Sequence, residues 1–204
     1  MSRITADTEA ADAQFWAEHG YTAAEIQERQ RATKRNKFLS RAFWAVAGVG
    51  GAVALVNTPV RFGQALDLGP WTDFVKHSDT MRYISDHVKG GGQAILYSQI
   101  ANMTLSQVFR EKAEEKTWKA TGKRPVLDMK DHSLLAGASC IVGGFGWEKF
   151  TQAASILHKF DTQDMMWYYI GVAALVAWNK TAEKLADAKY PSAQKAKKPS
   201  ALRQ

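Results

Sequence analysis

The five histidines are the first side chains that could do chemistry, as metal ligands or as general acids and bases. They are His19, His77, His87, His132 and His158. Neither a His-x₃-His pair nor a His-Glu-x-x-His motif occurs, so their spacing predicts no metal site. His77 and His87 flank a stretch with several aspartates. We interpret both as ordinary surface residues.

The nucleophile candidates are equally weak. Ser139 and Cys140 lie in the apolar run LLAGASCIVGG, with no base at a recognisable spacing, and a single cysteine excludes an internal disulfide or a cysteine zinc site. No phosphate-loop or dinucleotide motif occurs, and Gly90-Gly91-Gly92 is not followed by Lys-Ser/Thr. We therefore expect a hinge or tight connection at these glycines. We predict that the chain is not an enzyme and holds no cofactor.

The remaining polar candidates are the amides Gln99 and Asn102. They lie in residues 94–109, which contain no charged residue. If this stretch crosses a membrane, such amides either line a pore or form hydrogen bonds between helices, and we favour hydrogen bonding. An interfacial helix or a soluble core helix are the alternatives for this stretch.

The elements expected to position these candidate side chains are four apolar stretches: residues 42–60, 94–109, 133–150 and 165–178. A bilayer core about 30 Å thick needs about 20 helical residues. Trp44, Trp167 and Trp178 lie near ends of these stretches, where aromatic rings meet lipid headgroups. We predict an all-α, polytopic membrane protein with four spanning helices, two or three being the alternative. The mean hydropathy of −0.32 and the shortness of the runs leave a soluble helical protein as the rival.

Small residues in two of these stretches predict close helix packing. The spacing of four residues, which lets membrane helices approach closely, occurs in both the first and the third stretch. The predicted packing residues are Ala47, Gly48, Gly51, Ala52, Ala136, Cys140 and Gly144.

Polar segments flank the predicted bundle. Residues 1–41 are expected to form a helical hairpin, with Gly20 ending the first helix and the capping-box spacing of Thr22 and Glu25 starting the next. Residues 42–179 form the bundle. Residues 110–131 are expected to continue as helix to Thr121 and then form a solvated loop. Residues 180–204 extend the last helix to Tyr190-Pro191 and end in a disordered basic tail.

The distribution of charge predicts the orientation. The chain carries a net charge of +7. Four crossings place the N-terminus, residues 110–131 and the tail on one side, and this side holds nearly all the excess of Lys and Arg. By the positive-inside rule both termini lie in the cytoplasm or matrix of a bacterial or organellar inner membrane. The basic residues expected at the membrane surface are Lys34, Arg35, Lys37, Arg41, Lys180 and Lys184.

These features predict a non-catalytic structural or accessory subunit of a membrane assembly. Its expected partners are the lipid bilayer and other membrane subunits or further copies of itself. A small pore-forming protein and a soluble helical binding protein are the alternatives. Nucleic acid is not expected as a partner, because the aromatic residues are not interleaved with the basic ones.

Overall fold

The computed structural model describes residues 2–55, 70, 73, 77–83, 87–154 and 162–192, and every regular element in these residues is a helix. This confirms the all-α prediction. The elements are α1 (Ser2–Glu18), α2 (Ala23–Leu55), α5 (Asp79–Tyr83), α6 (Lys89–Thr121), α7 (Ser133–Ala154) and α8 (Thr162–Lys189). The predicted end of the first span, at residues 56–60, and most of the basic tail lie outside the described residues.

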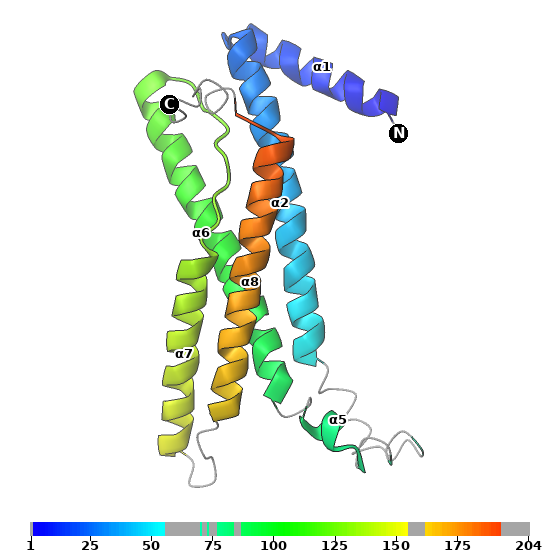
Figure 1. Cartoon of the computed structure of the whole chain (residues 1–204). Coiled ribbons are helices and arrows are strands. Elements are labelled where there is room, and N and C mark those ends of the chain that lie inside the picture. The colour runs from blue at the N-terminus through cyan, green and yellow to red at the C-terminus, as the bar shows by residue number, and fades with distance from the viewer. Residues whose placement is uncertain are drawn as a thin grey trace, which may run out of the picture.

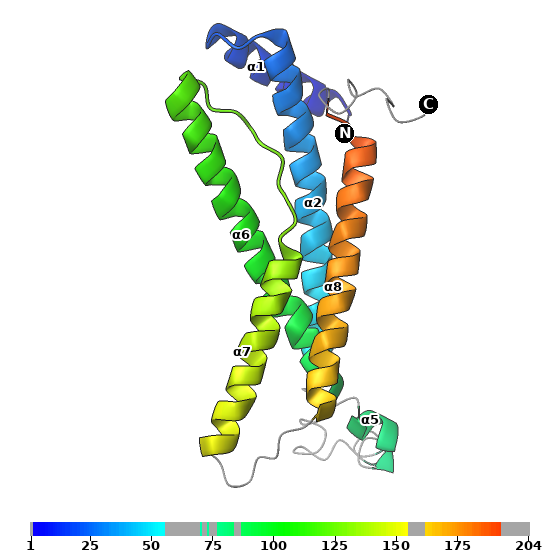
Figure 2. The ribbon, with the colours of Figure 1, turned by 60° about the vertical axis from the view of Figure 1, so that its left-hand side comes forward.

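Three long helices form the frame of the molecule (Figure 1). The 33 residues of α2 and of α6 each extend about 50 Å, and the two run in opposite directions. Helix α8 packs against both, and the shorter α7 packs against α6 and α8. Helix α1 and the end of α8 lie at one end of the molecule, and α5 lies at the other, as the turned view also shows (Figure 2). Helices α2 and α7 run in one direction and α6 and α8 in the other, and α7 begins near the middle of the molecule (Figures 1 and 2).

The helix ends follow the local sequence signals. The Thr22 backbone N–H donates to Glu25 Oε2 at 2.7 Å and the Glu25 N–H donates back to Thr22 Oγ1 at 3.3 Å, which confirms the capping box. Gly20 and Gly122 adopt φ values of +78° and +70°, a left-handed conformation that suits glycine after a helix. Helix α8 ends at Lys189, directly before Tyr190-Pro191. The start of α2 and the ends of α1, α6 and α8 were therefore predictable.

The expected break at Gly90-Gly91-Gly92 is wrong, because α6 begins at Lys89 and runs through all three glycines. A Cβ atom on Gly92 would lie 2.5 Å from the backbone N of Ala54 and 2.8 Å from the carbonyl oxygen of Gly50. Where α8 packs against α6, a Cβ atom on Gly171 of α8 would collide with the carbonyl oxygen of Gly91 of α6. The glycines let the backbones of α2, α6 and α8 meet, instead of breaking the chain.

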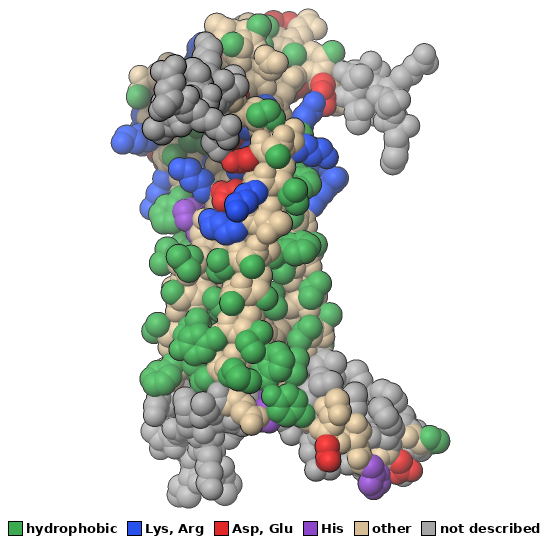
Figure 3. All heavy atoms as spheres, viewed as in Figure 1, with side chains coloured by type: hydrophobic (Ala, Val, Ile, Leu, Met, Phe, Trp, Pro, Cys, Tyr) green, Lys and Arg blue, Asp and Glu red, His purple; other side chains and the backbone are tan. Residues whose placement is uncertain are grey.

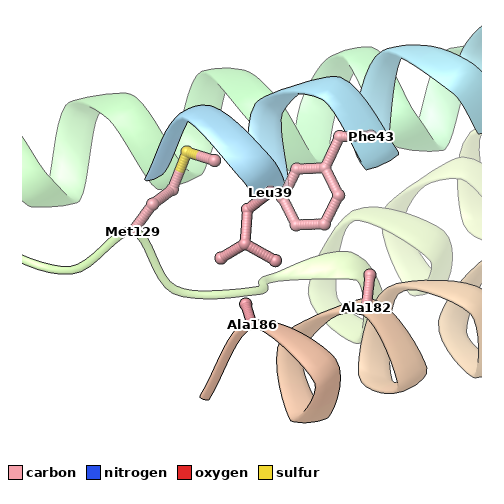
Figure 4. Packing of buried hydrophobic residues seen from close by; sticks show 5 residues of the cluster. All are labelled: Leu39, Phe43, Met129, Ala182 and Ala186. Atoms are coloured by element: carbon pink, nitrogen blue, oxygen red, sulfur yellow. The ribbon is translucent and has the colours of Figure 1, made fainter. Parts of the chain in front are cut away.

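Residues 122–132, here named the return segment, are also not a solvated loop. After α6 ends, this extended stretch runs back alongside α6 to the start of α7 (Figure 2). Its Met129 side chain joins a buried cluster with Leu39 and Phe43 of α2 and Ala182 and Ala186 of α8 (Figure 4). An extended backbone can be buried there because side chains of the neighbouring helices satisfy its polar groups.

The helices divide into two halves of opposite surface character. The apolar half comprises residues 42–55 of α2, 90–109 of α6, 133–146 of α7 and 165–179 of α8, and these ranges contain no Asp, Glu, Lys or Arg. The charged half comprises α1, residues 23–41, 110–121 and 180–189, and the return segment. Hydrophobic side chains cover the surface of the first half, and Lys and Arg side chains gather above them (Figure 3).

One described helix, α2, is long and apolar enough to cross a membrane, and residues Ser133–Gly146 form a shorter apolar helical stretch. Helices α6 and α8 are long, but both carry charged residues beyond their apolar residues. The structure therefore supports one candidate membrane helix by length and composition.

Candidate functional site

The predicted amides meet at the upper end of the apolar half, where α6 faces α8. Gln99, Asn102 and Asn179 are all completely buried. Asn179 Nδ2 donates to Gln99 Oε1 at 2.7 Å, and Asn102 Nδ2 approaches the same oxygen at 3.4 Å. Asn179 was missed as a partner because the sequence alone does not pair α6 with α8.

Asn102 and Ser106 extend this polar layer to the return segment. The backbone N–H of His132 donates to Asn102 Oδ1 at 2.7 Å, and Ser106 Oγ donates to the carbonyl oxygen of Lys130 at 2.6 Å. One spacing of four residues on α6 therefore satisfies the backbone on both sides of Asp131. The layer positions the residue at which α7 begins.

Asp131 connects that starting point to α8. Its carboxylate accepts hydrogen bonds from the Ser133 N–H at 3.0 Å and from Ser133 Oγ at 2.9 Å, so it binds a free N–H group at the start of α7. The Asp131 side chain is fully buried, and Lys180 Nζ lies 3.1 Å from its Oδ2. The hydrogen bond with Asp131 raises the pKa of Lys180.

The polar layer retains unused hydrogen-bonding capacity. Ser98 Oγ, Gln99 Nε2 and Asn179 Oδ1 are buried and have no hydrogen-bond partner in the described part of the chain. Leaving such a group without a partner costs about 1–3 kcal/mol. Amide groups and the serine hydroxyl do not ionise near neutral pH. The layer is thus suited to joining helices and not to acid–base chemistry.

A second polar cluster holds the return segment in the charged half. Arg35 is only 3% exposed, and it donates to Asp187 Oδ1 and to the carbonyl oxygen of Met129, each at 2.8 Å. Asn36 donates to the carbonyl oxygen of Leu127 at 2.8 Å and accepts from the Met129 N–H at 2.7 Å. Arg35 is therefore a buried structural residue, in contrast to the membrane-surface role expected of it.

The other predicted basic residues lie at the surface. Lys34 forms an ion pair with Glu9 of α1 at 2.9 Å, which helps to hold the N-terminal hairpin together. Lys180 is half exposed beside Asp131. The remaining three are exposed: Lys37, Arg41 and Lys184.

The predicted packing residues fall partly at helix contacts. Ala47 and Ala136 are buried, Cys140 is half-buried, and a Cβ atom on Gly144 would lie 3.3 Å from Tyr168 Cε1. At Gly48 and Gly51, no atom lies within 4 Å of the position that a Cβ atom would take. Ala52 is exposed. The tightest contacts instead involve Gly50, Gly92, Gly137 and Gly171. Spacing identified the helices that pack but not the faces that meet.

A cavity of about 570 Å³ lies between α6 and the return segment. Its lining combines basic, acidic, aromatic and small side chains from α2, α6 and the return segment, among them Arg31, Arg110, Lys130 and His132. No sequence motif marks this cavity, because the return segment brings together residues that are distant in the chain.

Among known proteins, neither a family model, nor a curated protein, nor a solved structure matches this chain.

Proposed function

We propose that this chain is an integral membrane protein that crosses the bilayer four times and acts as a non-catalytic subunit of a membrane assembly. The observation that carries the proposal is the exposure of large apolar side chains throughout the apolar half. Val142 is 72% exposed, Leu134 70% and Leu55 64%. Exposed apolar patches of this extent mark membrane or protein contact sites.

The interior of the same half buries polar side chains alongside apolar ones such as Leu175. Its buried side chains include Ser98, Gln99, Asn102 and Asn179. In lipid, helices associate through small residues and polar hydrogen bonds, since burying apolar surface away from apolar lipid gains little. Only 28% of the apolar window in α2 is buried inside the molecule. A soluble core helix would be mostly buried.

The charged half supports the role of a subunit. Residues 110–121 of α6 extend beyond the start of α7, and α1 projects from the N-terminal end of α2 (Figure 1). Both carry exposed aromatic side chains, Trp118 and Phe15. These exposed surfaces suit contacts with other proteins on the side of the membrane that holds both termini.

The pore hypothesis is weaker because Gln99 and Asn102 are hydrogen-bonded to Asn179 and to the return segment. The soluble binding protein is weaker because it would expose the whole apolar half to water, at about 25 cal/mol per Å².

Two experiments test the proposal. Alkaline carbonate extraction should leave the protein in the membrane pellet, and its release into the supernatant would refute membrane insertion. In the Cys140→Ala background, Thr33→Cys and Ala188→Cys should react with an impermeant maleimide from one side of the membrane, and Thr80→Cys from the other. Labelling of all three from one side would contradict four crossings.

The subunit role is tested separately. After mild detergent solubilisation, size-exclusion chromatography with light scattering should show the chain within a larger complex. A stable lone monomer would count against this part of the proposal.

A further inference from the structure

The cavity between α6 and the return segment has unused hydrogen-bond donors. Arg31 is already paired, since its Nη2 lies 2.8 Å from Glu28 and 2.7 Å from Asp128, and this uses both acidic residues of the lining. Arg110 Nε is buried without a hydrogen bond, and the nearest carboxylate oxygen, on Glu114, lies 3.6 Å away. The Lys130 ammonium forms no hydrogen bond or ion pair within the described part of the chain. Within the described residues, the cavity lining therefore holds two cations with spare hydrogen-bonding capacity: Arg110, whose Nε forms only a 3.6 Å ion pair with Glu114, and the exposed Lys130.

The cavity also lies at the boundary between the two halves. His132, whose ring packs against Phe109 with 4.9 Å between the ring centroids, lines the cavity and directly precedes α7. The first turn of α7 then exposes Leu134 and Leu135. Lys and Arg side chains gather directly above the hydrophobic surface in the space-filling view (Figure 3). Donors in a cavity above exposed leucines match a molecule with an anionic head and an apolar tail.

We propose that this cavity binds the phosphate headgroup of an anionic phospholipid. Arg110 and Lys130 contact the phosphate oxygens, and the acyl chains lie along Phe109, Leu134 and Leu135. Guanidinium groups bind phosphate through charge-assisted hydrogen bonds, and an ammonium adds a mobile point charge. The proposal rests on membrane insertion, because the exposed leucines must face lipid. A free phosphate would use the same donors but would gain nothing from the apolar side chains.

The test measures lipid binding to the full-length protein in detergent by native mass spectrometry. Phosphatidylglycerol, phosphatidylcholine and inorganic phosphate are titrated separately. Phosphatidylglycerol should bind more tightly than phosphatidylcholine, and inorganic phosphate should bind more weakly than phosphatidylglycerol. Equal binding of both lipids, or binding of inorganic phosphate as tight as that of phosphatidylglycerol, would overturn the proposal.

Charge-matched variants locate the site. Lys130→Gln should weaken phosphatidylglycerol binding about fivefold, in line with the contribution of one basic side chain near an anionic lipid surface. Adding Arg110→Gln should weaken it further. The control pair Lys112→Gln and Lys119→Gln removes two charges from exposed positions of α6 outside the cavity, and it should leave binding unchanged. An equal loss in the control would overturn the proposal.

Two safeguards keep the result interpretable. The Lys130 ammonium has no hydrogen bond or ion pair with the described residues, so Lys130→Gln tests the site even if Arg110→Gln disturbs the Glu114 ion pair. Carbonate extraction of each variant separates the two proposals. Retention in the membrane with unchanged lipid binding would refute the headgroup site alone, whereas release of the unmodified chain would refute membrane insertion.

Discussion

The apolar half and the charged half bury different groups along the same three helices. In the apolar half, glycines bring the backbones of α2, α6 and α8 together, and amides are buried among apolar side chains that face outward. In the charged half, Leu39 and Ala186 are buried, and most charged side chains lie at the surface. This difference is the one that the proposed membrane insertion would require, with lipid around the apolar half and water around the charged half.

The comparison shows that different interactions hold the two halves. The charged half gains from burying apolar area and from the Arg35 cluster, which fixes the return segment. The apolar half depends on close packing at glycines and on a few interhelical hydrogen bonds. The polar layer and Asp131 lie where the two halves meet, and they connect α6, α7 and α8.

Removing the buried Arg35 side chain from the charged half should lower the unfolding midpoint more than any other change. Arg35→Met leaves the buried Met129 carbonyl without its donor, which costs about 1–3 kcal/mol, and it also removes the partly buried ion pair with Asp187. Thermal unfolding in detergent should show a large decrease in the midpoint. Lys37→Met, an exposed change on the same helix, should have almost no effect. Equal midpoints for the two variants would contradict the role of Arg35.

In the apolar half, one added methyl group at the contact between α2 and α6 should be enough to destabilise the fold. Gly92→Ala places a Cβ atom against the backbone of Ala54 and Gly50, and such overpacking costs about 1–3 kcal/mol. Gly48→Ala is the matched control, because nothing lies within 4 Å of its Cβ position and alanine favours a helix by about 1 kcal/mol. The unfolding midpoint should fall for the first variant and hold or rise for the second. The reverse order would refute the contact between α2 and α6.

The amide layer should contribute less. Asn179→Leu removes the donor to Gln99, and hydrogen bonds between membrane helices contribute about 1 kcal/mol. Gln107→Leu changes an exposed amide on α6 and serves as the control. Chemical unfolding in mixed micelles should separate the two variants. A larger loss for the exposed position would show that the layer does not join α6 to α8.

The smallest effect should be a pH dependence of the unfolding midpoint that arises from Glu25, in the first turn of α2. The pKa of Glu25 falls from 4.5 to about 2, first through the hydrogen bond from the Thr22 backbone and then through Lys123. A lowered pKa means that the carboxylate stabilises the fold above pH 4.5, and that this contribution is lost as the pH falls toward 2.

Unfolding midpoints of the unmodified chain and of Glu25→Gln should therefore differ above pH 4.5 and converge near pH 2. Glu111→Gln, at an exposed position of α6, is the control. A Glu25→Gln difference that stays constant over this range would contradict the lowered pKa.

The amino-acid sequence alone was enough to predict four helix boundaries and the separation of charge. Thr22, Gly122 and Pro191 act through contacts within a few residues, so their local spacing was sufficient to predict these helix boundaries. The absence of charge from the four apolar ranges is likewise a property of the sequence.

Which groups meet across the helices depends on the packing of the folded chain. Gly92 is a site of helix contact because Ala54 of α2 lies against it, although three consecutive glycines in isolation favour a break. Arg35 is buried because the return segment and α8 cover it, and Gln99 is paired because Asn179 faces it from α8. Each of these depends on residues more than 35 positions away in the chain, and the periodicity of a single helix carries no information about its partner.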